Sequence, residues 1–187
     1  MLLTRSTNSR APLVAALLRG KAVIMACDTI YGIVGHFPDA EDEIRRLKGR
    51  SETHPFLVLI ADASYLSSLD AILPETSILS LWPGPYSFIF PTAGGGTIAC
   101  RIPGDKRLRS IIREVGAPLY SSSVNRTGQP PMDNPSLIAA EFKNENIIIE
   151  DSGRYSGRLP STLIDLTGKP AKIVRQGAGK VPRKYLV

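Results

Sequence analysis

Two cations stand one glycine apart in the stretch Lys48-Gly49-Arg50. That spacing lets both side chains reach one polyanion, the lysine as a point charge and the arginine as a bidentate fork. Basic residues also close many helices, where they complement the negative end of the helix dipole. From these residues alone, the helix-end interpretation is favoured over a phosphate site.

A second group is the run Ser121-Ser122-Ser123-Val124-Asn125, which follows an apolar stretch immediately. Small hydroxyl and amide side chains supply donors and acceptors without filling the space that a ligand needs. A Ser/Asn turn closed by Gly128 explains the same run equally well. Both interpretations therefore stand at this point.

Arg101 is a third candidate, because it sits in the otherwise apolar run 97–102. A buried arginine needs an anionic partner, which is either a carboxylate of the protein or that of a ligand. Cys27 is a weaker candidate for a nucleophile, since no histidine lies near it in the sequence. A buried, inert thiol is the better interpretation of Cys27.

The chain lacks the common signatures of nucleotide binding and hydrolysis: Gly-x-x-x-x-Gly-Lys-Ser/Thr, Gly-x-Gly-x-x-Gly after a strand, Gly-x-Ser-x-Gly and His-Glu-x-x-His. Gly94-Gly95-Gly96 lies between two predicted strands, so a hairpin turn is favoured over a phosphate loop. Two Cys and two His without paired short spacing argue against a zinc site. We expect no metal ligands from the protein, and reduced thiols rather than a disulfide.

The length, net charge and apolar runs of the sequence limit the class of protein. The 187 residues suffice for one well-buried core, and we expect a single domain over 1–187. The net charge of +6 suits a nucleotide or nucleic acid, and equally an ordinary, modestly basic protein. No apolar run approaches the length of a bilayer, and residues 1–10 lack the core of a signal peptide. We therefore expect a cytoplasmic protein without a membrane partner.

A short buried strand is the element around which these groups are arranged. The run 22–27 has the length and β-branched content of a strand, and it breaks into the polar stretch 28–32. A buried strand that ends in a polar loop presents groups to a ligand in open α/β sheets. We expect the cations, the hydroxyl groups and Arg101 to converge on the end of this strand.

The rest of the chain mixes helices and strands without strict alternation. The predicted helices are 12–19, 40–47, 62–69, 74–82, 105–115 and 134–142, where the third, fifth and sixth begin at their caps. The further predicted strands are 56–60, 86–90, 97–102, 119–122, 146–150, 162–166 and 171–175. This order predicts an α/β fold of α+β type, with a twisted mixed β-sheet and flanking helices. From about residue 176 we expect a mobile Gly- and Lys/Arg-rich tail.

Seven short motifs stand in one order along the chain: Asp28-Thr-Ile-Tyr-Gly32, Lys48-Gly-Arg50, Trp82-Pro-Gly-Pro85, Thr97-Ile-Ala-Cys-Arg-Ile-Pro103, Ser123-Val-Asn125, Ser161-Thr162 and Val174-Arg175-Gln-Gly177. Together they resemble the YrdC/TsaC family, the threonylcarbamoyl-AMP synthases, in its short, single-domain form. The match runs from Lys21 to Gly177, nearly the whole chain. Any one motif is weak, whereas seven in order are specific.

The resemblance implies a YrdC-like fold with a concave basic cleft, and an ATP-dependent reaction. Threonine, bicarbonate or CO2, and ATP give threonylcarbamoyl-AMP and pyrophosphate, with Mg²⁺ on the phosphates as the expected cofactor. The product feeds a separate threonylcarbamoyl transferase complex, which modifies the adenosine next to the anticodon of certain tRNAs.

The resemblance also implies roles for individual residues. Lys48 and Arg50 are the implied catalytic cations. The implied ATP-binding residues are Lys48, Arg50, His54, Thr97, Ser123, Asn125 and Arg175. The implied threonine-binding residues are Thr29, Arg101, Ser121 and Ser161. The sequence departs from the family's usual pattern at Ala26-Cys27, Ser87 and Val124, where Pro-Thr, Thr and Ala are usual.

A second hypothesis is a non-catalytic RNA-binding module of the same fold, with tRNA or double-stranded RNA in the cleft. Basic residues gather at 45–50 and again at 106–113. A helix that carries the second group is most often a solvated face. An RNA-binding module should show steep salt dependence and would not need Arg101 inside a strand. The synthase hypothesis is therefore favoured.

Overall fold

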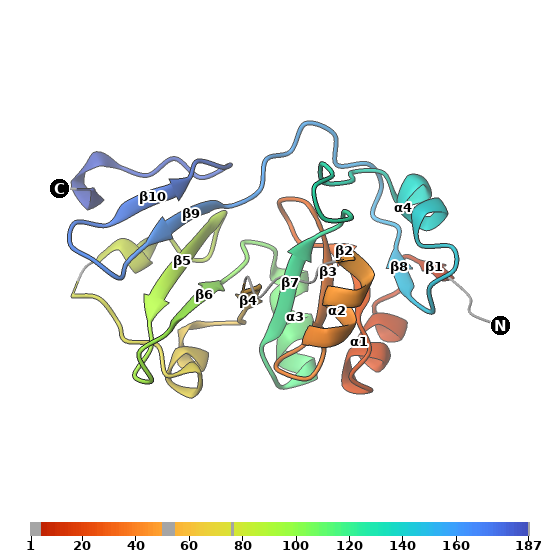
Figure 1. The fold of residues 1–187 in the computed structure, drawn as a ribbon, viewed down its shortest axis with the longest axis horizontal. Coiled ribbons are helices and arrows are strands. Elements are labelled where there is room, and N and C mark those ends of the chain that lie inside the picture. The colour runs from red at the N-terminus through yellow and green to blue at the C-terminus, as the bar shows by residue number, and fades with distance from the viewer. Residues whose placement is uncertain (1–4, 50–54, 76, 187) are drawn as a thin grey trace.

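The computed structural model describes residues 5–49, 55–75 and 77–186. One mixed sheet runs through them, in the order β1-β8-β2-β3-β7-β4-β6-β5-β9-β10. The strands are β1 Arg5–Thr7, β2 Val23–Ala26, β3 Tyr31–His36, β4 Leu57–Leu59, β5 Tyr86–Pro91, β6 Thr97–Arg101, β7 Leu119–Ser123, β8 Ile148–Glu150, β9 Thr162–Asp165 and β10 Lys172–Arg175. Figure 1 shows the two chain ends at opposite ends of an elongated molecule.

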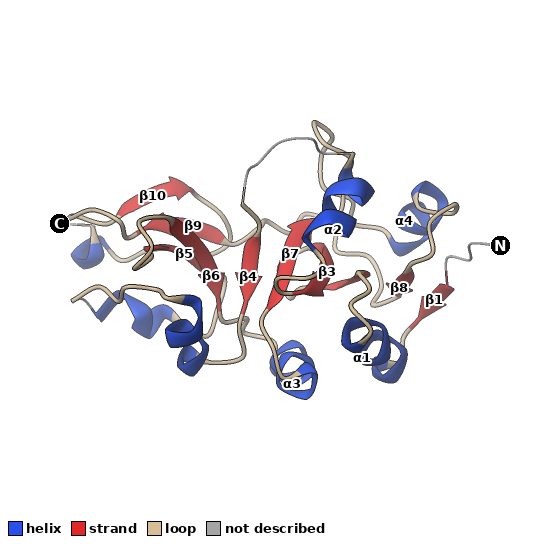
Figure 2. Ribbon diagram, turned by 60° about the horizontal axis from the view of Figure 1, so that its bottom comes forward, coloured by secondary structure: helices blue, strands red, loops and turns tan. Residues whose placement is uncertain are grey.

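Helices cover both faces of the sheet. The α-helices are α1 Arg10–Leu18, α2 Glu41–Lys48, α3 Lys106–Val115 and α4 Pro135–Glu141, and the 3₁₀ helices are η1 Ala63–Leu69, η2 Ser77–Leu81 and η3 Arg183–Tyr185. In Figure 2, α1 and α3 lie below the sheet, whereas α2 and α4 lie above it. The predicted mixed sheet with flanking helices is confirmed. None of the helices in the described ranges is long and apolar enough to cross a membrane.

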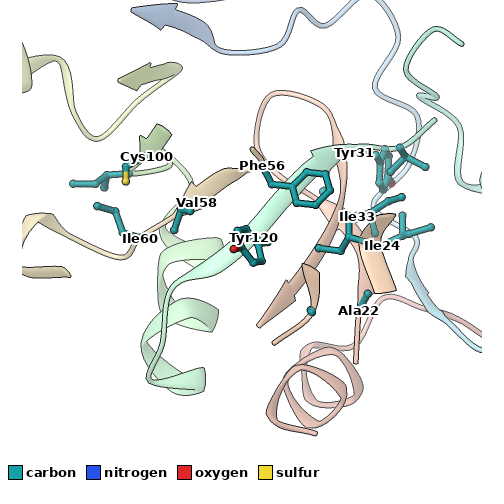
Figure 3. Close-up of a cluster of buried hydrophobic side chains, with 14 of the residues drawn as sticks. Ala22, Ile24, Tyr31, Ile33, Phe56, Val58, Ile60, Cys100 and Tyr120 are labelled. Carbon is teal, nitrogen blue, oxygen red and sulfur yellow. The ribbon is translucent and has the colours of Figure 1, made fainter. Parts of the chain in front are cut away.

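Two hydrophobic cores separate along alternate residues of the strands, because successive side chains point to opposite faces. In β2, Val23 and Met25 join the core under α1 and α3, which we call the α1–α3 core. Ile24 and Ala26 join the core on the other face, called the second core. Figure 3 shows part of the second core, where Ile24, Ile33 and Phe56 gather beside one another.

The helices α3 and α4 begin at capping residues that the sequence indicates. Asp105 accepts a hydrogen bond from the backbone N–H of Arg107 at 2.7 Å, and Asn134 does so from Ser136 at 2.9 Å. Gly49 and Gly116 close α2 and α3 in the left-handed conformation, which glycine adopts without steric cost. The predicted helix caps at Asp105 and Asn134 are confirmed.

Two strands are absent from the prediction, and two predicted helices are of the 3₁₀ type. The strand β3 begins inside the expected polar stretch 28–32, and it pairs antiparallel with β2 in a hairpin. The short edge strand β1, parallel to β8, was not predicted. The predicted helix 62–69, with its cap at Asp62, is confirmed as the 3₁₀ helix η1, and within 74–82 the 3₁₀ helix η2 spans Ser77–Leu81. A 3₁₀ helix has three residues per turn, and a few apolar positions in a short stretch do not distinguish this period from the 3.6 of an α-helix.

Candidate functional site

A pocket of about 310 Å³ opens where the α1–α3 core ends. Leu57 of β4 lines the pocket and has Ser121 of β7 and Ala99 of β6 as its register partners. Two residues further along the same face, Leu59 and Leu119 are buried in the α1–α3 core. Small and polar side chains therefore replace large apolar ones along one continuous face, and this replacement creates the hollow.

Arg101 is 2% exposed and is held on three sides. Its Nη2 forms an ion pair with Asp28, its Nη1 donates to Thr29 Oγ1 at 2.9 Å, and its Nε donates to Gly84 O at 3.2 Å. The sequence left open whether a protein or a ligand carboxylate would balance this charge. Asp28 supplies the protein carboxylate, while Arg101 still lines the pocket.

Two serine hydroxyl groups form a pair in the wall of the pocket. The oxygens of Ser87 and Ser161 lie 2.7 Å apart and hydrogen-bond to each other. Both residues are buried, and both line the pocket, as do Thr29 and Ser121. Hydroxyl groups both donate and accept, so this wall can hydrogen-bond to donors and to acceptors of a ligand.

Arg175 also lines the pocket, next to Ser161, and donates to the backbone oxygen of Ser161 at 2.9 Å. Arg175 is an exposed residue by surface area, but partial desolvation of its guanidinium, followed by the neighbouring guanidinium of Arg101, lowers its pKa. Among the described residues no carboxylate lies within ion-pair distance of it. Asp28 balances only one of the two guanidinium groups, so the pocket retains positive charge and suits an anion.

Lys48 ends α2, as the helix-end interpretation required, but its ammonium turns inward and the residue is 4% exposed. The Nζ atom donates to Ser123 O at 2.7 Å, Asn125 Oδ1 at 2.9 Å and Asn125 O at 3.2 Å. Ser123 also donates from Oγ to Asn125 Oδ1 at 2.6 Å. Lys48 thus holds the turn after β7. Ser123, at the start of this turn, lines the pocket.

The structure brings together most of the expected site residues. Thr29, Arg101, Ser121, Ser123, Ser161 and Arg175 line the pocket. Lys48 and Asn125 lie behind Ser123. Thr97 instead lines a neighbouring pocket of about 280 Å³, which shares Pro55 and Phe56 with the first. Arg50 and His54 lie outside the described residues.

Two residues of this site were quoted from the sequence without a role. Asp28 stood in the first motif, but its partner Arg101 is 73 positions away, a contact that no local pattern reveals. Ser87 stood out only as a departure from the usual threonine. Its contact with Ser161 depends on the parallel pairing of β5 with β9.

The thiol of Cys27 lines the pocket but is buried. Burial raises the pKa of Cys27 to about 12, so the reactive thiolate is absent near neutral pH. Cys27 and Cys100 are both free and belong to different cores, the α1–α3 core and the second core. Cys27 therefore lacks the properties of a catalytic nucleophile.

The segment after β10 contacts β9 closely. Thr162 Oγ1 donates to Gly179 O at 2.6 Å and accepts from the backbone N–H of Gly177 at 3.0 Å. A Cβ on Gly177 would lie 2.1 Å from the backbone oxygen of Pro160, so only glycine allows this approach. The mobility expected from about residue 176 stays a prediction.

Known proteins share the sequence pattern and the fold of this chain. The threonylcarbamoyl-AMP synthase of Bacillus subtilis is 31% identical over 179 residues, covering 87% of this chain and 52% of that protein. The threonylcarbamoyl-AMP synthase of Chromohalobacter salexigens is 30% identical over 172 residues, covering 83% and 91%. This chain spans about half the length of the Bacillus subtilis and Pyrococcus abyssi relatives.

Solved structures match the same architecture. Pyrococcus abyssi Sua5 complexed with L-threonine aligns with a TM-score of 0.80 at 25% identity, covering 95% of this chain and 57% of that one. Escherichia coli YciO aligns with a TM-score of 0.80 at 23% identity over 100% and 99%, which shows the shared fold. Fold and pocket together define an α/β protein with a YrdC-like mixed sheet. The family model for Sua5/YciO/YrdC, described as "Telomere recombination", matches residues 15–177, and the chain belongs to this family.

Proposed function

We propose that this protein is an L-threonylcarbamoyladenylate synthase, which forms threonylcarbamoyl-AMP and pyrophosphate from threonine, bicarbonate or CO2, and ATP. The observation that carries the proposal is one pocket lined by two guanidinium groups and a set of hydroxyls, with its thiol kept neutral. The names of the relatives and the threonine complex of the Pyrococcus abyssi protein support it.

The site is proposed to have an amino-acid end and a nucleotide end. Arg101 grips the carboxylate of threonine, while the hydroxyls of Thr29, Ser121 and Ser161 hydrogen-bond to its polar groups. The ATP phosphates lie toward Arg175 and the turn that Lys48 holds. The remaining nucleotide contacts come from Ser123, Asn125 and Thr97, together with Arg50 and His54.

The chemistry asks for positioning more than for a reactive side chain. The neutral amine of threonine attacks CO2 and loses a proton to water, which gives a carbamate, one oxygen of which attacks the α-phosphorus of ATP. The new P–O bond replaces the bond to pyrophosphate, which leaves with its electron pair. The carbamate is already a nucleophile, so the pocket contributes by aligning the reactants and by balancing phosphate charge.

Magnesium is proposed to enter with ATP as part of the substrate. No group of three or more His, Cys, Asp or Glu able to hold a metal occurs within the described ranges. Mg²⁺ usually keeps several waters and binds substrate phosphates, so this chemistry needs no protein cage. We further propose that the reaction takes place in the cytoplasm and that a separate transferase complex consumes the product.

Pyrophosphate release tests the proposal directly. The full reaction contains protein, MgATP, threonine and bicarbonate, and each component is omitted in turn. We expect release only in the complete mixture, with threonylcarbamoyl-AMP as the coupled product. Release that is independent of threonine would contradict the proposal. Binding of RNA with steep salt dependence, without any pyrophosphate, would instead support the RNA-binding module.

A further inference from the structure

Asp28 has an unusual backbone conformation for a residue with a side chain, with φ of 56°. Aspartate visits this left-handed region more readily than most residues, because its short side chain forms local hydrogen bonds. In this protein the Asp28 side chain instead forms hydrogen bonds to residues far away in the sequence. The conformation turns the carboxylate away from β2 and β3 and toward Arg101 and the segment that precedes α3.

Both oxygens of the Asp28 carboxylate have partners. Oδ1 accepts from Arg101 Nη2, while Oδ2 accepts from the backbone N–H of Gly104 at 2.7 Å and of Asp105 at 3.3 Å. The backbone of Asp28 is held separately, since Arg158 Nη1 donates to its carbonyl oxygen at 2.9 Å. The carboxylate is thus anchored on one side and supports the guanidinium on the other.

The contacts of Arg101 leave a specific part of its guanidinium for a ligand. Nη1 uses one hydrogen on Thr29 and Nη2 uses one on Asp28, while the single hydrogen of Nε goes to Gly84. Among the described residues, one N–H on each terminal nitrogen is left without a partner. At the end of a guanidinium, one outward N–H from each terminal nitrogen forms the fork that binds a carboxylate with two parallel hydrogen bonds.

We propose that Asp28 is a positioning residue, which orients Arg101 so that this fork receives the carboxylate of the amino-acid substrate. The inference rests on the proposed function and extends it to a residue that does not touch the substrate. Orientation requires a carboxylate, because an asparagine offers one oxygen. That oxygen can accept from Arg101 or from the Gly104 N–H, but cannot fill both positions.

The central experiment compares Asp28→Asn with Asp70→Asn. Asp70 is the matched control, because it is an exposed aspartate with nearly the same backbone conformation, φ 53°. For each protein we would measure the KM for threonine and for ATP, threonine binding by calorimetry, and the urea midpoint. Asp28→Gly is a second test variant, since glycine suits the left-handed backbone and removes the carboxylate.

We expect Asp28→Asn to raise the threonine KM and Kd by about tenfold or more, the effect of losing one charge-assisted hydrogen bond. The ATP KM should stay at the wild-type value, as should every parameter of Asp70→Asn. If Asp28→Asn fails to fold, the same pattern is expected from Asp28→Gly.

Three results would overturn the inference. A wild-type threonine KM in folded Asp28→Asn would remove the positioning role while leaving the proposed function intact. A parallel rise of both KM values would assign Asp28 to the general fold of the site. A wild-type protein that neither binds threonine nor needs it to release pyrophosphate would overturn the proposed function itself, and the inference with it.

Discussion

The hydroxyl oxygens of Ser87 and Ser161 lie 2.7 Å apart inside the pocket, although the two residues are 74 positions apart in the chain. The parallel pairing of Tyr86 with Thr162 sets them side by side. Each hydroxyl limits the rotation of the other. The orientation of the Ser161 hydroxyl toward a ligand therefore depends on Ser87.

Replacing Ser87 with alanine should leave the buried hydroxyl of Ser161 without its partner. We expect unfolding free energy to fall by about 1 kcal/mol and the threonine KM to rise, because a hydrogen bond of ordinary strength is lost. Ser87→Thr, which keeps the hydroxyl, should stay close to wild type. Urea denaturation and threonine titration of pyrophosphate release measure both quantities. Equal values for Ser87→Ala and wild type would show that the pair does not orient Ser161.

Removing the ammonium of Lys48 should break its hydrogen bonds to Ser123 and Asn125 in the turn after β7. Lys48→Ala is expected to suppress pyrophosphate release severely and to cost about 1.5–3 kcal/mol of stability, as charge-assisted hydrogen bonds do. Arg46→Ala is the control on the same helix, since its side chain is 58% exposed. Arg50→Ala should reduce turnover as severely. Near-normal turnover at saturating ATP in either variant would remove that residue from the site.

Arg101→Lys keeps the charge but loses the planar fork. We expect threonine use to fall sharply and nucleotide affinity to change little, because one ammonium cannot replace the contacts with Asp28, Thr29 and Gly84 together with a ligand carboxylate. The measurement is the threonine dependence of pyrophosphate release beside nucleotide binding. Weaker nucleotide binding with unchanged threonine dependence would mean that the two ends of the site are reversed.

Arg175→Gln tests the nucleotide end. Its guanidinium faces the pocket without a carboxylate partner among the described residues, so its loss should weaken ATP binding and leave the threonine KM unchanged. Lys172→Gln on the same strand removes an exposed positive charge and serves as the control. Calorimetric titration with ATP distinguishes the two. Equal weakening by both variants would indicate only a long-range charge effect.

Alkaline pH should destabilise the folded protein. Burial raises the pKa of Cys27 and of Cys100 from 9.0 to about 12. Between these values the unfolded chain has released protons that the folded chain keeps, so stability is full below pH 9.0 and falls as the pH rises through this window. Burial also raises the pKa of Tyr31 and Tyr120 to about 12, which adds to the loss.

The urea midpoint below pH 9.0 and again within this window measures the effect. A Cys27→Ala/Cys100→Ala double variant is the control, and its midpoint should fall less than that of the wild type. A urea midpoint that increases as the pH is raised beyond 9.0 would contradict the assignment of the two thiols. An equal decrease of the midpoint in the wild type and the double variant would contradict it as well.

Local patterns in the sequence predicted the elements with strong signals. The capped helix α3 and the apolar β4 follow directly from period and composition. The strand β3 could not be predicted because Gly32 and Gly35 weaken its strand pattern. Close packing against neighbouring side chains requires glycine at both positions. A Cβ on Gly35 would lie 2.3 Å from Ala40, and one on Gly32 would lie 2.8 Å from the sulfur of Cys27.

The candidate site could likewise be predicted only in part. Its residue types could be named from the sequence, and most of them meet in one pocket. Their partners could not be named, because the ion pair of Arg101 with Asp28 and the contact of Lys48 with Ser123 depend on strand order. Strand order depends on the pairing of distant segments, for which a single sequence carries no periodic signal.

The parallel pairing of β5 with β9 has a consequence for the way the chain opens and closes. Within the described residues, four register pairs with β5 attach the β9–β10 hairpin to the rest of the sheet, and this hairpin carries Arg175. A short, edge-located unit of this kind exchanges its amide hydrogens by local unfolding before the centre of the sheet does. Because ATP would bind the docked hairpin in preference to the detached one, nucleotide should slow hydrogen exchange in β9 and β10. The two strands would then act as a reporter of ligand occupancy.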